Sequence, residues 1–569
     1  MAGAAGTAVS GPGAVADTVL TGGAVYTVDA ARSWAQAVAV RDGRVCAVGP
    51  DAEVAPWIGP RTRVIPLRGR LLVPGFQDAH VHVPSGGLSR LRCDLSGAHT
   101  LPGYLDRVRA YAASHPEREW IVGEGWSMDV FPGGRPERGA LDAVVPDRPV
   151  FLSNRDNHGA WVNSRALALG GITRDSPDPA DGRVERGPDG EPLGTLQEGA
   201  MALVSRLVPR PTRAEQLAGL LEGQRHLHSL GITAWQDALV GEYATMPDSF
   251  DTYLEADAGG RLTARVVGAL WWRRDRGLEQ LEELRARRAA VPPGRFRATT
   301  VKIMVDGVCE NFTAALLRPY LDARGRPTVE RGLTFVDPGA LPEAAAAIDA
   351  AGFQLHFHAI GDRAVRLALD AVERARQRNG PNDHRPHIAH LQVVHPQDLP
   401  RFRALGVVVN AQPLWAMADA QMTELTMPFL GPERSAWQYP WGRLQASGAS
   451  LAIGSDWPVS SPDPLWLLHV AVNRTAPGPM AAAATAAQPF LPEERLDLPT
   501  ALAAATRGSA YVNHLEGETG SIEVGRWADL ALIDRNLFQE PANAIGEARV
   551  VLTLAGGDPV HADPNAVSW

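Results

Sequence analysis

The sequence predicts an α/β protein: an eight-stranded (β/α)8 TIM barrel, a β-sandwich domain built from both termini, and an insertion over the barrel mouth. Three observations support this fold class. Short apolar runs alternate with Ala-, Leu-, Arg- and Glu-rich helical segments through the centre of the chain. Both ends contain strands and turns instead. The segment between the first two predicted barrel strands, 84–230, is far too long for one βα unit.

Length and composition agree with a large globular enzyme. The chain has 569 residues, of which 45% are hydrophobic and 21% charged, so it can bury a sizeable core. A net charge of −9 and a pI near 6.0 argue against nucleic-acid binding. The sequence has no basic run suited to a membrane surface and no apolar stretch of about 18 residues. The three cysteines are too few for a disulfide framework, so we expect a cytoplasmic protein.

The two ends of the chain are predicted to form one domain. Residues 1–16 are mostly small, without the charged and apolar regions of a signal peptide, and should form a flexible tail. From Asp17 to residue 73 the pattern is short strands and turns, with a hairpin turn at Asp42-Gly43. The same pattern returns in 515–569. We therefore predict a β-sandwich from 17–73 and 515–569.

Residues 74–514 should form the barrel. Helical segments separate most of its predicted strands, and 95–225 should form the insertion. The eight strands are expected at 76–83, 231–238, 264–272, 299–307, 353–360, 386–393, 407–413 and 450–458.

Histidine placement gives the clearest functional signal. His80 and His82 are two residues apart on the first strand and so face the same side. His358, His390 and Asp456 lie at or near the ends of later strands, where barrel active sites are found. Four imidazoles and a carboxylate that converge there suit a divalent metal ion such as zinc.

Other histidines compete for these roles, and a single strand histidine is more often a core residue than a ligand. His356 shares a face with His358, and His387 precedes His390 by three residues. We interpret both as neighbours of the ligands. His226 and His228 form a second H-x-H, but on a predicted helix where the two side chains face apart, so we expect surface residues.

Lys302 is the only lysine among 55 basic residues, and it lies on the fourth predicted strand. A neutral lysine can react with carbon dioxide to give an anionic carbamate that bridges two divalent ions. Arginine cannot do this, because its guanidinium stays protonated. We therefore interpret Lys302 as a bridging ligand. The alternative is a buried lysine paired with Asp306 or another carboxylate.

Several motifs in order along the chain resemble the metal-dependent amidohydrolase superfamily. They are VPGFQDAHVHV, VKIMVDG, FHAIGDRAV, HIAHLQVVHPQDLPRF, AIGSDWPVSSPDPL and GSIEVGRWADLALID. The branch they resemble most is the YtcJ-like group, which includes N-substituted formamide deformylases. The resemblance implies the barrel with its sandwich, and a carboxylated lysine among the metal ligands. The implied ligand set is His80, His82, Lys302, His358, His390 and Asp456.

The insertion also resembles that branch in the stretches that face substrate. Candidate substrate-binding residues there are Trp126, Asn157, His158, Trp161 and Glu198. The alternative for Trp161, as for Asn163, is that it simply pins the insertion to the barrel. Asn157 departs from the glycine that is common before this histidine, which leaves the acyl or amine group unassigned.

These residues together predict metal-assisted hydrolysis of a small-molecule amide, with an N-formyl or N-acyl amine as substrate. One or two zinc-like ions would activate water, and Asp456 would act as general base and then general acid. Alternatives are a lactone, ester or carbamate hydrolase or a deaminase with the same metals, and, in another class, a metal-free binding scaffold. The sequence shows no G-x-S-x-G elbow and no C-x-x-C pair for a rival catalytic system. A homo-oligomer is compatible with the sequence.

Overall fold

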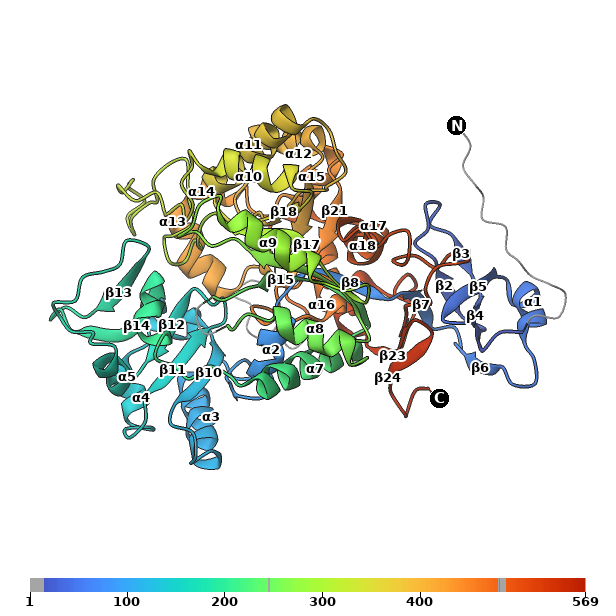
Figure 1. Cartoon of the computed structure of the whole chain (residues 1–569), viewed down its shortest axis with the longest axis horizontal. Coiled ribbons are helices and arrows are strands. Elements are labelled where there is room, and N and C mark those ends of the chain that lie inside the picture. Colours follow the sequence, from blue (N-terminus) through green and yellow to red (C-terminus); the bar gives the residue numbers. More distant parts are fainter. Residues whose placement is uncertain (1–14, 244–245, 479, 481–487, 568–569) are drawn as a thin grey trace.

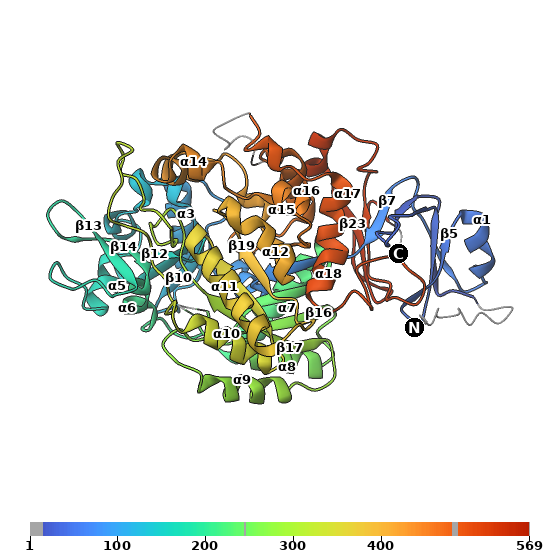
Figure 2. The same ribbon diagram turned by 90° about the horizontal axis from the view of Figure 1, so that it is seen from above.

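The computed structural model describes residues 15–243, 246–478, 480 and 488–567. The predicted tail at 1–16 falls almost wholly outside these residues. Three parts follow one another along the long axis of the molecule (Figure 1). The barrel occupies the middle, the insertion lies at one end, and the two chain ends form the β-structure at the other (Figure 2).

The barrel is a sheet of eight parallel strands, which confirms the predicted fold class. Neighbouring strands follow the chain order from β8 to β21. Two backbone hydrogen bonds close the ring, from Asp456 N to His80 O (2.7 Å) and from His82 N to Trp457 O (2.9 Å). The strands are β8 (Phe76–Val81), β15 (Ile232–Val240), β16 (Arg265–Trp271), β17 (Phe296–Met304), β18 (Gln354–Ala359), β19 (His387–His390), β20 (Val408–Ala411) and β21 (Leu451–Ile453).

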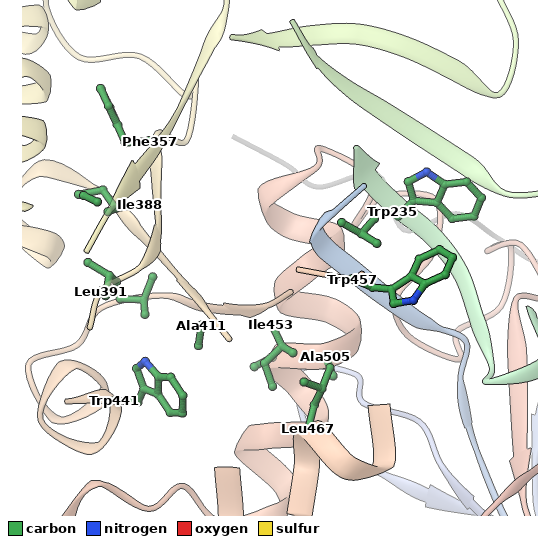
Figure 3. Packing of buried hydrophobic residues seen from close by; sticks show 14 of the residues in the cluster. Trp235, Phe357, Ile388, Leu391, Ala411, Trp441, Ile453, Trp457, Leu467 and Ala505 are labelled. Atoms are coloured by element: carbon green, nitrogen blue, oxygen red, sulfur yellow. The ribbon is translucent and has the colours of Figure 1, made fainter. Parts of the chain in front are cut away.

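Amphipathic helices cover the barrel and bury their apolar stripes against it. Along α11, apolar residues recur at the three- and four-residue spacing of one helix face, and Ala364, Val365, Ala368 and Leu369 are buried. The strands contribute large apolar side chains such as Trp235 and Phe357 to the same cluster (Figure 3). The helices named below are α2 (Val83–Arg90), α7 (Arg213–Ser229), α8 (Phe250–Ala258), α9 (Gln280–Ala289), α10 (Leu341–Ala350), α11 (Asp362–Asn379), α12 (Leu399–Leu405), α15 (Trp441–Ala446) and α16 (Pro464–Asn473). Of the helices in the described part of the chain, none combines the length and apolar character needed to span a bilayer.

Two sheets at the chain ends form the sandwich. One has the order β5-β4-β1-β6, and the other, β24-β23-β22-β7-β2-β3, pairs strands from both ends of the chain. The predicted hairpin turn is confirmed, because Asp42 (φ 51°) and Gly43 (φ 73°) join β4 to β5. The strands are β1 (Thr18–Thr21), β2 (Ala24–Tyr26), β3 (Trp34–Ala35), β4 (Ala37–Arg41), β5 (Arg44–Gly49), β6 (Arg63–Pro66), β7 (Leu71–Pro74), β22 (Leu530–Ile533), β23 (Val550–Ala555) and β24 (Asp558–Ala562).

The insertion has its own sheet and its own apolar core. The sheet order is β13-β14-β12-β11-β10-β9, and α3 (Leu101–Ser114) packs beside it. Trp126 and Trp161 are fully buried in the cluster on one side of this sheet. The strands are β9 (Cys93–Asp94), β10 (Ile121–Trp126), β11 (Val150–Asn154), β12 (Gly159–Val162), β13 (Gly182–Arg186) and β14 (Pro192–Glu198).

The prediction that His226 and His228 are surface residues was wrong. His228 is buried, and its ring joins two elements: Nδ1 contacts the Ile232 carbonyl and Nε2 the Thr263 hydroxyl, both at 2.8 Å. His226 is half-buried, and its ring centroid lies 5.3 Å from that of Trp457. Helix α7 packs against other elements on most of its sides, including α2, α8 and β15. Side chains two residues apart, such as His226 and His228, can therefore both contact protein.

A buried ion pair joins the barrel to the sandwich. Arg265, at the start of β16, lies 3.1 Å from Asp529, which precedes β22, and both side chains are buried. We expect Asp529→Ala to lower the free energy of unfolding by about 3–5 kcal/mol, because it leaves a buried guanidinium unpaired. Thermal or denaturant unfolding measures this. Arg297→Ala, which removes a half-exposed pair with Glu518, is the control and should cost about 1 kcal/mol or less. Equal losses in the two variants would contradict the assignment.

Candidate active site

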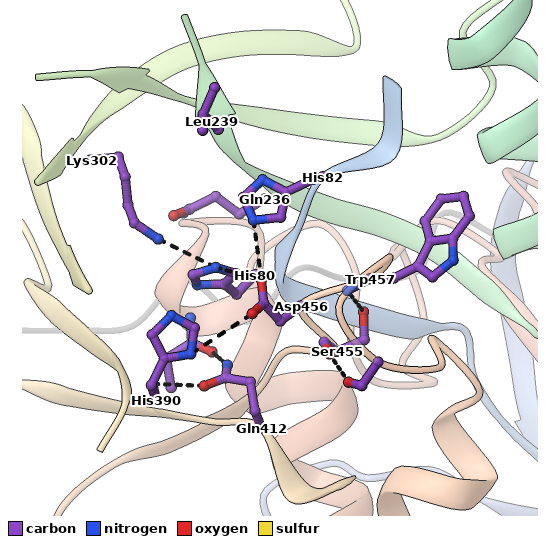
Figure 4. Close-up of polar contacts among 12 residues, drawn as sticks. His80, His82, Gln236, Leu239, Lys302, His390, Gln412, Ser455, Asp456 and Trp457 are labelled. Atoms are coloured by element: carbon purple, nitrogen blue, oxygen red, sulfur yellow. Dashed lines mark hydrogen bonds and ion pairs between the residues drawn. The ribbon is translucent and has the colours of Figure 1, made fainter. Parts of the chain in front are cut away.

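The six predicted metal ligands come together at the carboxyl ends of the barrel strands. Figure 4 shows five of them, His80, His82, Lys302, His390 and Asp456. The six residues arrive from four regions of the barrel: β8 and the residue after it, β17, the neighbouring strands β18 and β19, and the turn after β21. All are buried or nearly so, and His82 is the most exposed, with 14% of its side chain accessible. The residues are His80, His82, Lys302, His358, His390 and Asp456.

Asp456 is the centre of this group. Its Oδ1 lies 3.1 Å from His80 Nε2 and 3.0 Å from His82 Nε2, and its Oδ2 lies 4.0 Å from His390 Nδ1. One ligand atom from each of His80, His390 and Asp456 lies within 4.8 Å of the other two. Two imidazoles and a carboxylate at this spacing can surround one divalent ion.

A hydrogen-bond chain beneath the site begins at the backbone. Gln354 Nε2 donates to the carbonyls of Arg385 (2.9 Å) and Val512 (2.6 Å), which fixes the orientation of its amide. Gln354 Oε1 therefore accepts from Gln236 Nε2 at 3.1 Å. Because its nitrogen is committed to Gln354, Gln236 presents its oxygen to the next residue in the chain.

That oxygen determines the histidine tautomers. Gln236 Oε1 lies 2.7 Å from His356 Nδ1, so this nitrogen carries the proton. His356 Nε2 must then accept from His80 Nδ1, 2.9 Å away. The remaining nitrogen of His80, Nε2, bears a lone pair and faces the Asp456 carboxylate. Burial holds the pKa of His80 well below its usual range, so the ring is neutral.

A lone pair and a carboxylate oxygen 3.1 Å apart repel each other unless a positive group, either a metal ion or the ammonium form of Lys302 that lies 3.3 Å from the same nitrogen, is present beside them. Two further histidines of the group each offer a ring nitrogen. The Nδ1 atoms of His82 and His390 are buried and make no hydrogen bond with the described residues. The donor set therefore fits a divalent ion bound by nitrogen and oxygen.

Lys302 is placed to react as a neutral amine. Its Nζ lies 3.3 Å from His80 Nε2 and 3.5 Å from His356 Nε2. Burial lowers the pKa of Lys302 to about 7, against the opposing charges of Asp456 and Asp237. The alternative partner, Asp306, instead accepts backbone N–H groups from Ala315, Ile360 and Gly361, at 2.8–3.0 Å.

His358 faces the insertion side of the site. Its ring centroid lies 4.5 Å from that of His390 and 5.6 Å from that of His158. Its Nε2 lies 3.8 Å from Asp306 Oδ1 and 3.4 Å from the Gly307 carbonyl. His358 thus stands between the barrel histidines and the residue that the insertion contributes.

The insertion brings His158 and Glu198 into this mouth as a buried pair. His158 Nδ1 lies 2.9 Å from Glu198 Oε2, and the Thr313 hydroxyl donates to Glu198 Oε1 at 2.6 Å. Burial alone would lower the pKa of His158, but the charge and hydrogen bond of Glu198 outweigh it and raise the pKa to about 9. Asn157 occupies the tight turn just before, with φ 61°.

Trp126 and Trp161 lie elsewhere. Trp126 Nε1 donates to the Leu152 carbonyl and Trp161 Nε1 to the Glu137 carbonyl, inside the core of the insertion. Both side chains therefore pack in the core of the insertion, whereas the alternative expected for Trp161 was packing against the barrel. Gln236, by contrast, was not among the predicted residues. The available signal was a polar side chain within an apolar strand, GITAWQDA, whose interior must be satisfied.

Strained backbone occurs at the site, as it does at several other positions of the described chain. Asp456 (φ 57°), His390 (φ 81°) and Glu198 (φ 52°) all adopt the left-handed region that side chains other than glycine avoid. Such strain typically occurs where surrounding structure holds a functional group in place. Gly454 has a related role, because a Cβ atom there would lie 2.6 Å from His80 Cβ.

Comparison with known proteins agrees with this geometry. The Amidohydrolase family model matches residues 63–561. The chain is 31% identical to Protein LONG AFTER FAR-RED 3 of Arabidopsis thaliana, over 96% of this chain and 92% of that protein. It is 29% identical to the putative amidohydrolase YtcJ of Bacillus subtilis (95% and 98% covered). It is 26% identical to N-substituted formamide deformylase of Arthrobacter pascens (95% and 97% covered).

A solved structure extends the agreement to three dimensions. An uncharacterized metal-dependent hydrolase from Pyrococcus furiosus superposes with a TM-score of 0.68 at 27% identity, covering 91% of this chain and 99% of that one. The family match spans most of the chain, including every barrel strand and all six predicted ligands. The chain belongs to the amidohydrolase family.

Proposed function

We propose that this protein hydrolyses the C–N bond of a small, non-peptide amide, an N-formyl or N-acyl amine, with a divalent metal ion. The observation that carries the proposal is the lone pair of His80 held 3.1 Å from the Asp456 carboxylate, an arrangement that suits a cation bound by both groups. The similarity to N-substituted formamide deformylase supports an amide as substrate.

The six converging side chains would hold one or two ions. Imidazole and carboxylate ligands suit zinc. When bound, such an ion supplies Lewis acidity, which polarises a carbonyl and lowers the pKa of water towards neutrality. The remaining chemistry falls to the side chains of this chain.

Asp456 is the proposed proton carrier. Burial alone would raise its pKa, but the hydrogen bond from His82 and the charges of His390 and His82 outweigh burial and hold the pKa below its usual value. The carboxylate is therefore ionised at neutral pH and can accept a proton from the attacking water. It then donates that proton to the leaving nitrogen, so that an amine and a carboxylic acid are released.

His158 is the proposed contact with the substrate oxygen. Because Glu198 occupies its Nδ1, its Nε2 is left to face the mouth beside His358. A donor there can stabilise negative charge that develops on the carbonyl oxygen.

Lys302 is the proposed carbamate. Its neutral amine would add to the carbon of carbon dioxide, forming an N–C bond with release of one proton. The product is an anion with two oxygen atoms available as ligands, in place of a cation that would repel metal ions.

The direct test combines metal analysis with a substrate panel. Purified protein should contain tightly bound divalent metal and release amine and acid from N-formyl or N-acetyl amines. Esters, lactones and amino-heterocycles complete the panel. If one of these compounds is turned over faster than the amides, its class is the substrate class of the enzyme. A protein that contains no bound metal would contradict the proposal.

We expect His80→Ala to lose bound metal and to lower kcat/KM by about 10³-fold or more, because it removes a ligand at the centre of the cluster. Elemental analysis and turnover measure this, and circular dichroism should show an intact fold. His99→Ala, at an exposed histidine, is the control. A His80→Ala variant that keeps its metal would show that this histidine is not a ligand.

Lys302→Arg should be as inactive as Lys302→Ala, although it keeps the positive charge. Arginine forms no carbamate, and its fixed charge repels metal ions. Acetate should partly restore metal binding to Lys302→Ala, where space is left, but not to Lys302→Arg. Because the chain has no other lysine, the N-terminus is the one other primary amine to which carbon dioxide could add. Full activity in Lys302→Arg would rule out the carbamate.

Gln236→Met should weaken metal binding by about 10- to 100-fold, because it frees His356 and lets His80 rotate or change tautomer. Competition with a chelator measures the affinity independently of turnover. The matched control is Gln397→Met, at an exposed glutamine outside the site. An unchanged metal affinity would mean that the hydrogen-bond chain does not position His80.

A further inference from the structure

A small hollow lies beside His82, on the side of its ring that faces away from Asp456. His82, Asp237 and Ser249 line the hollow together with Leu239 and the start of α2. In Figure 4, Leu239 lies on the other side of the His82 ring from Asp456. The space open to the centre of a water molecule is about 20 Å³, which is room for about one water. The hollow is therefore too small for a substrate but has the size of a site for a single water.

The two ring nitrogens of His82 have different surroundings. Nε2 lies 3.0 Å from Asp456 Oδ1, among the candidate metal ligands. Nδ1 is buried and makes no hydrogen bond with any described residue. A neutral ring that gives its Nε2 lone pair to a metal ion carries its proton on Nδ1. That N–H then needs an acceptor, because an unpaired buried donor is destabilising.

Asp237, on β15, offers acceptor atoms in the wall of the same hollow. The carboxylate is held by two donors: Oδ1 accepts from the Leu239 backbone N–H at 3.1 Å, and Oδ2 accepts from the Tyr253 hydroxyl at 2.6 Å. Each carboxylate oxygen has two lone pairs, so each keeps one for a further donor. A molecule that both accepts and donates can join the Nδ1–H of His82 to this carboxylate, and water is the smallest such molecule.

Ser249 supplies a third polar group. It occupies the N-cap position of α8, where a serine hydroxyl usually accepts a backbone N–H of the helix. Here the hydroxyl makes no such bond, and it is buried without a hydrogen-bond partner among the described residues. It is therefore available to the hollow. Three polar groups around one small space match the two to four partners that a buried water takes.

We propose that the hollow binds one ordered water molecule that accepts from His82 Nδ1 and donates to Asp237, with Ser249 as its third partner. Asp237 and Ser249 are then positioning residues that act on the metal site through this water. They hold the His82 ring in place and keep its lone pair on Nε2. A carboxylate linked to a histidine ligand also makes the metal-binding nitrogen more basic. The inference rests on the proposed metal-dependent hydrolysis, in which His82 is a ligand.

A high-resolution crystal structure of the zinc-loaded protein tests the water directly. We expect density for one water in the hollow, about 2.6–3.2 Å from His82 Nδ1, from a carboxylate oxygen of Asp237 and from Ser249 Oγ. An empty hollow, or a direct hydrogen bond from His82 to Asp237, would overturn the inference.

Zinc affinity, measured by competition with a chelator, tests the positioning role. Asp237→Asn keeps the shape of the side chain but removes its charge, and should weaken zinc binding by about 10- to 100-fold. Ser249→Ala should weaken it by about 2- to 10-fold, and the variant should fold because it removes no side-chain hydrogen bond between described residues. The control is Asp349→Asn, at a buried aspartate on α10 whose partners include Asn382 and His384. It should leave the zinc affinity unchanged.

Cobalt-loaded protein separates an effect on His82 from a general loss of stability. The visible absorption of bound Co²⁺ depends on the field of its ligands. Asp237→Asn and Ser249→Ala should therefore both shift the spectrum, and Asp349→Asn should not. A spectrum that neither of the first two variants changes would mean that Asp237 and Ser249 support only the fold.

None of these measurements needs a substrate, so failure of the inference and failure of the proposed function are distinguishable. A protein with the water and the two weakened variants that hydrolyses no amide would keep the inference and refute the reaction. A protein that hydrolyses amides but has the same zinc affinity in Asp237→Asn and Ser249→Ala would keep the reaction and refute the inference.

Discussion

The active centre depends on one constraint: His80 must keep its proton on Nδ1. Backbone carbonyls fix Gln354, Gln354 fixes Gln236, and Gln236 fixes the His356 ring that accepts from His80. Each link has only one arrangement that satisfies both partners in a buried setting. Through this series of hydrogen bonds, the position of a backbone carbonyl determines which nitrogen of His80 carries the lone pair. That lone pair meets the Asp456 carboxylate, an arrangement that suits a cation bound by both groups.

The end of the barrel is shaped around this meeting. The last strand was predicted at 450–458 but ends at Ile453. After Ile453 the backbone turns, with Asp456 at φ 57°, so that Asp456 faces His80. Asp78 holds the turn by accepting the backbone N–H groups of both His80 and Ser455, at 3.0 Å each. Left-handed backbone at His390 and Asp456 costs stability, which the surrounding core must offset. The turn after β21 therefore both closes the barrel sheet and positions Asp456.

Sequence patterns predicted the barrel and the convergence of its candidate ligands, because the spacing of residues along a strand sets which face their side chains share. The pair His80 and His82, two residues apart, had to share a face, and Lys302 stood out as the only amine in the chain. The hydrogen-bond chain was beyond such reasoning, because Gln236 and His356 meet across strands whose register is set by tertiary packing. Trp126 and Trp161 were placed beside the substrate for a similar reason. A tryptophan side chain suits a binding pocket or an apolar core equally well. The fold of the insertion, which the sequence pattern did not give, places both in its core.

The barrel and the insertion contribute different residues to the candidate site. The barrel contributes all six candidate ligands, on strands that rigid packing holds in place, which suits groups that must keep sub-ångström geometry. The insertion contributes the buried pair of His158 and Glu198, which lies beside the barrel histidines at His358. Because the insertion has its own core, its surface residues can change without disturbing the ligands. Among the described residues, the ring of His158 approaches that of His358, its carbonyl accepts from Asn311, and Glu198 accepts from Thr313, so the insertion meets the candidate ligands themselves mainly through His158.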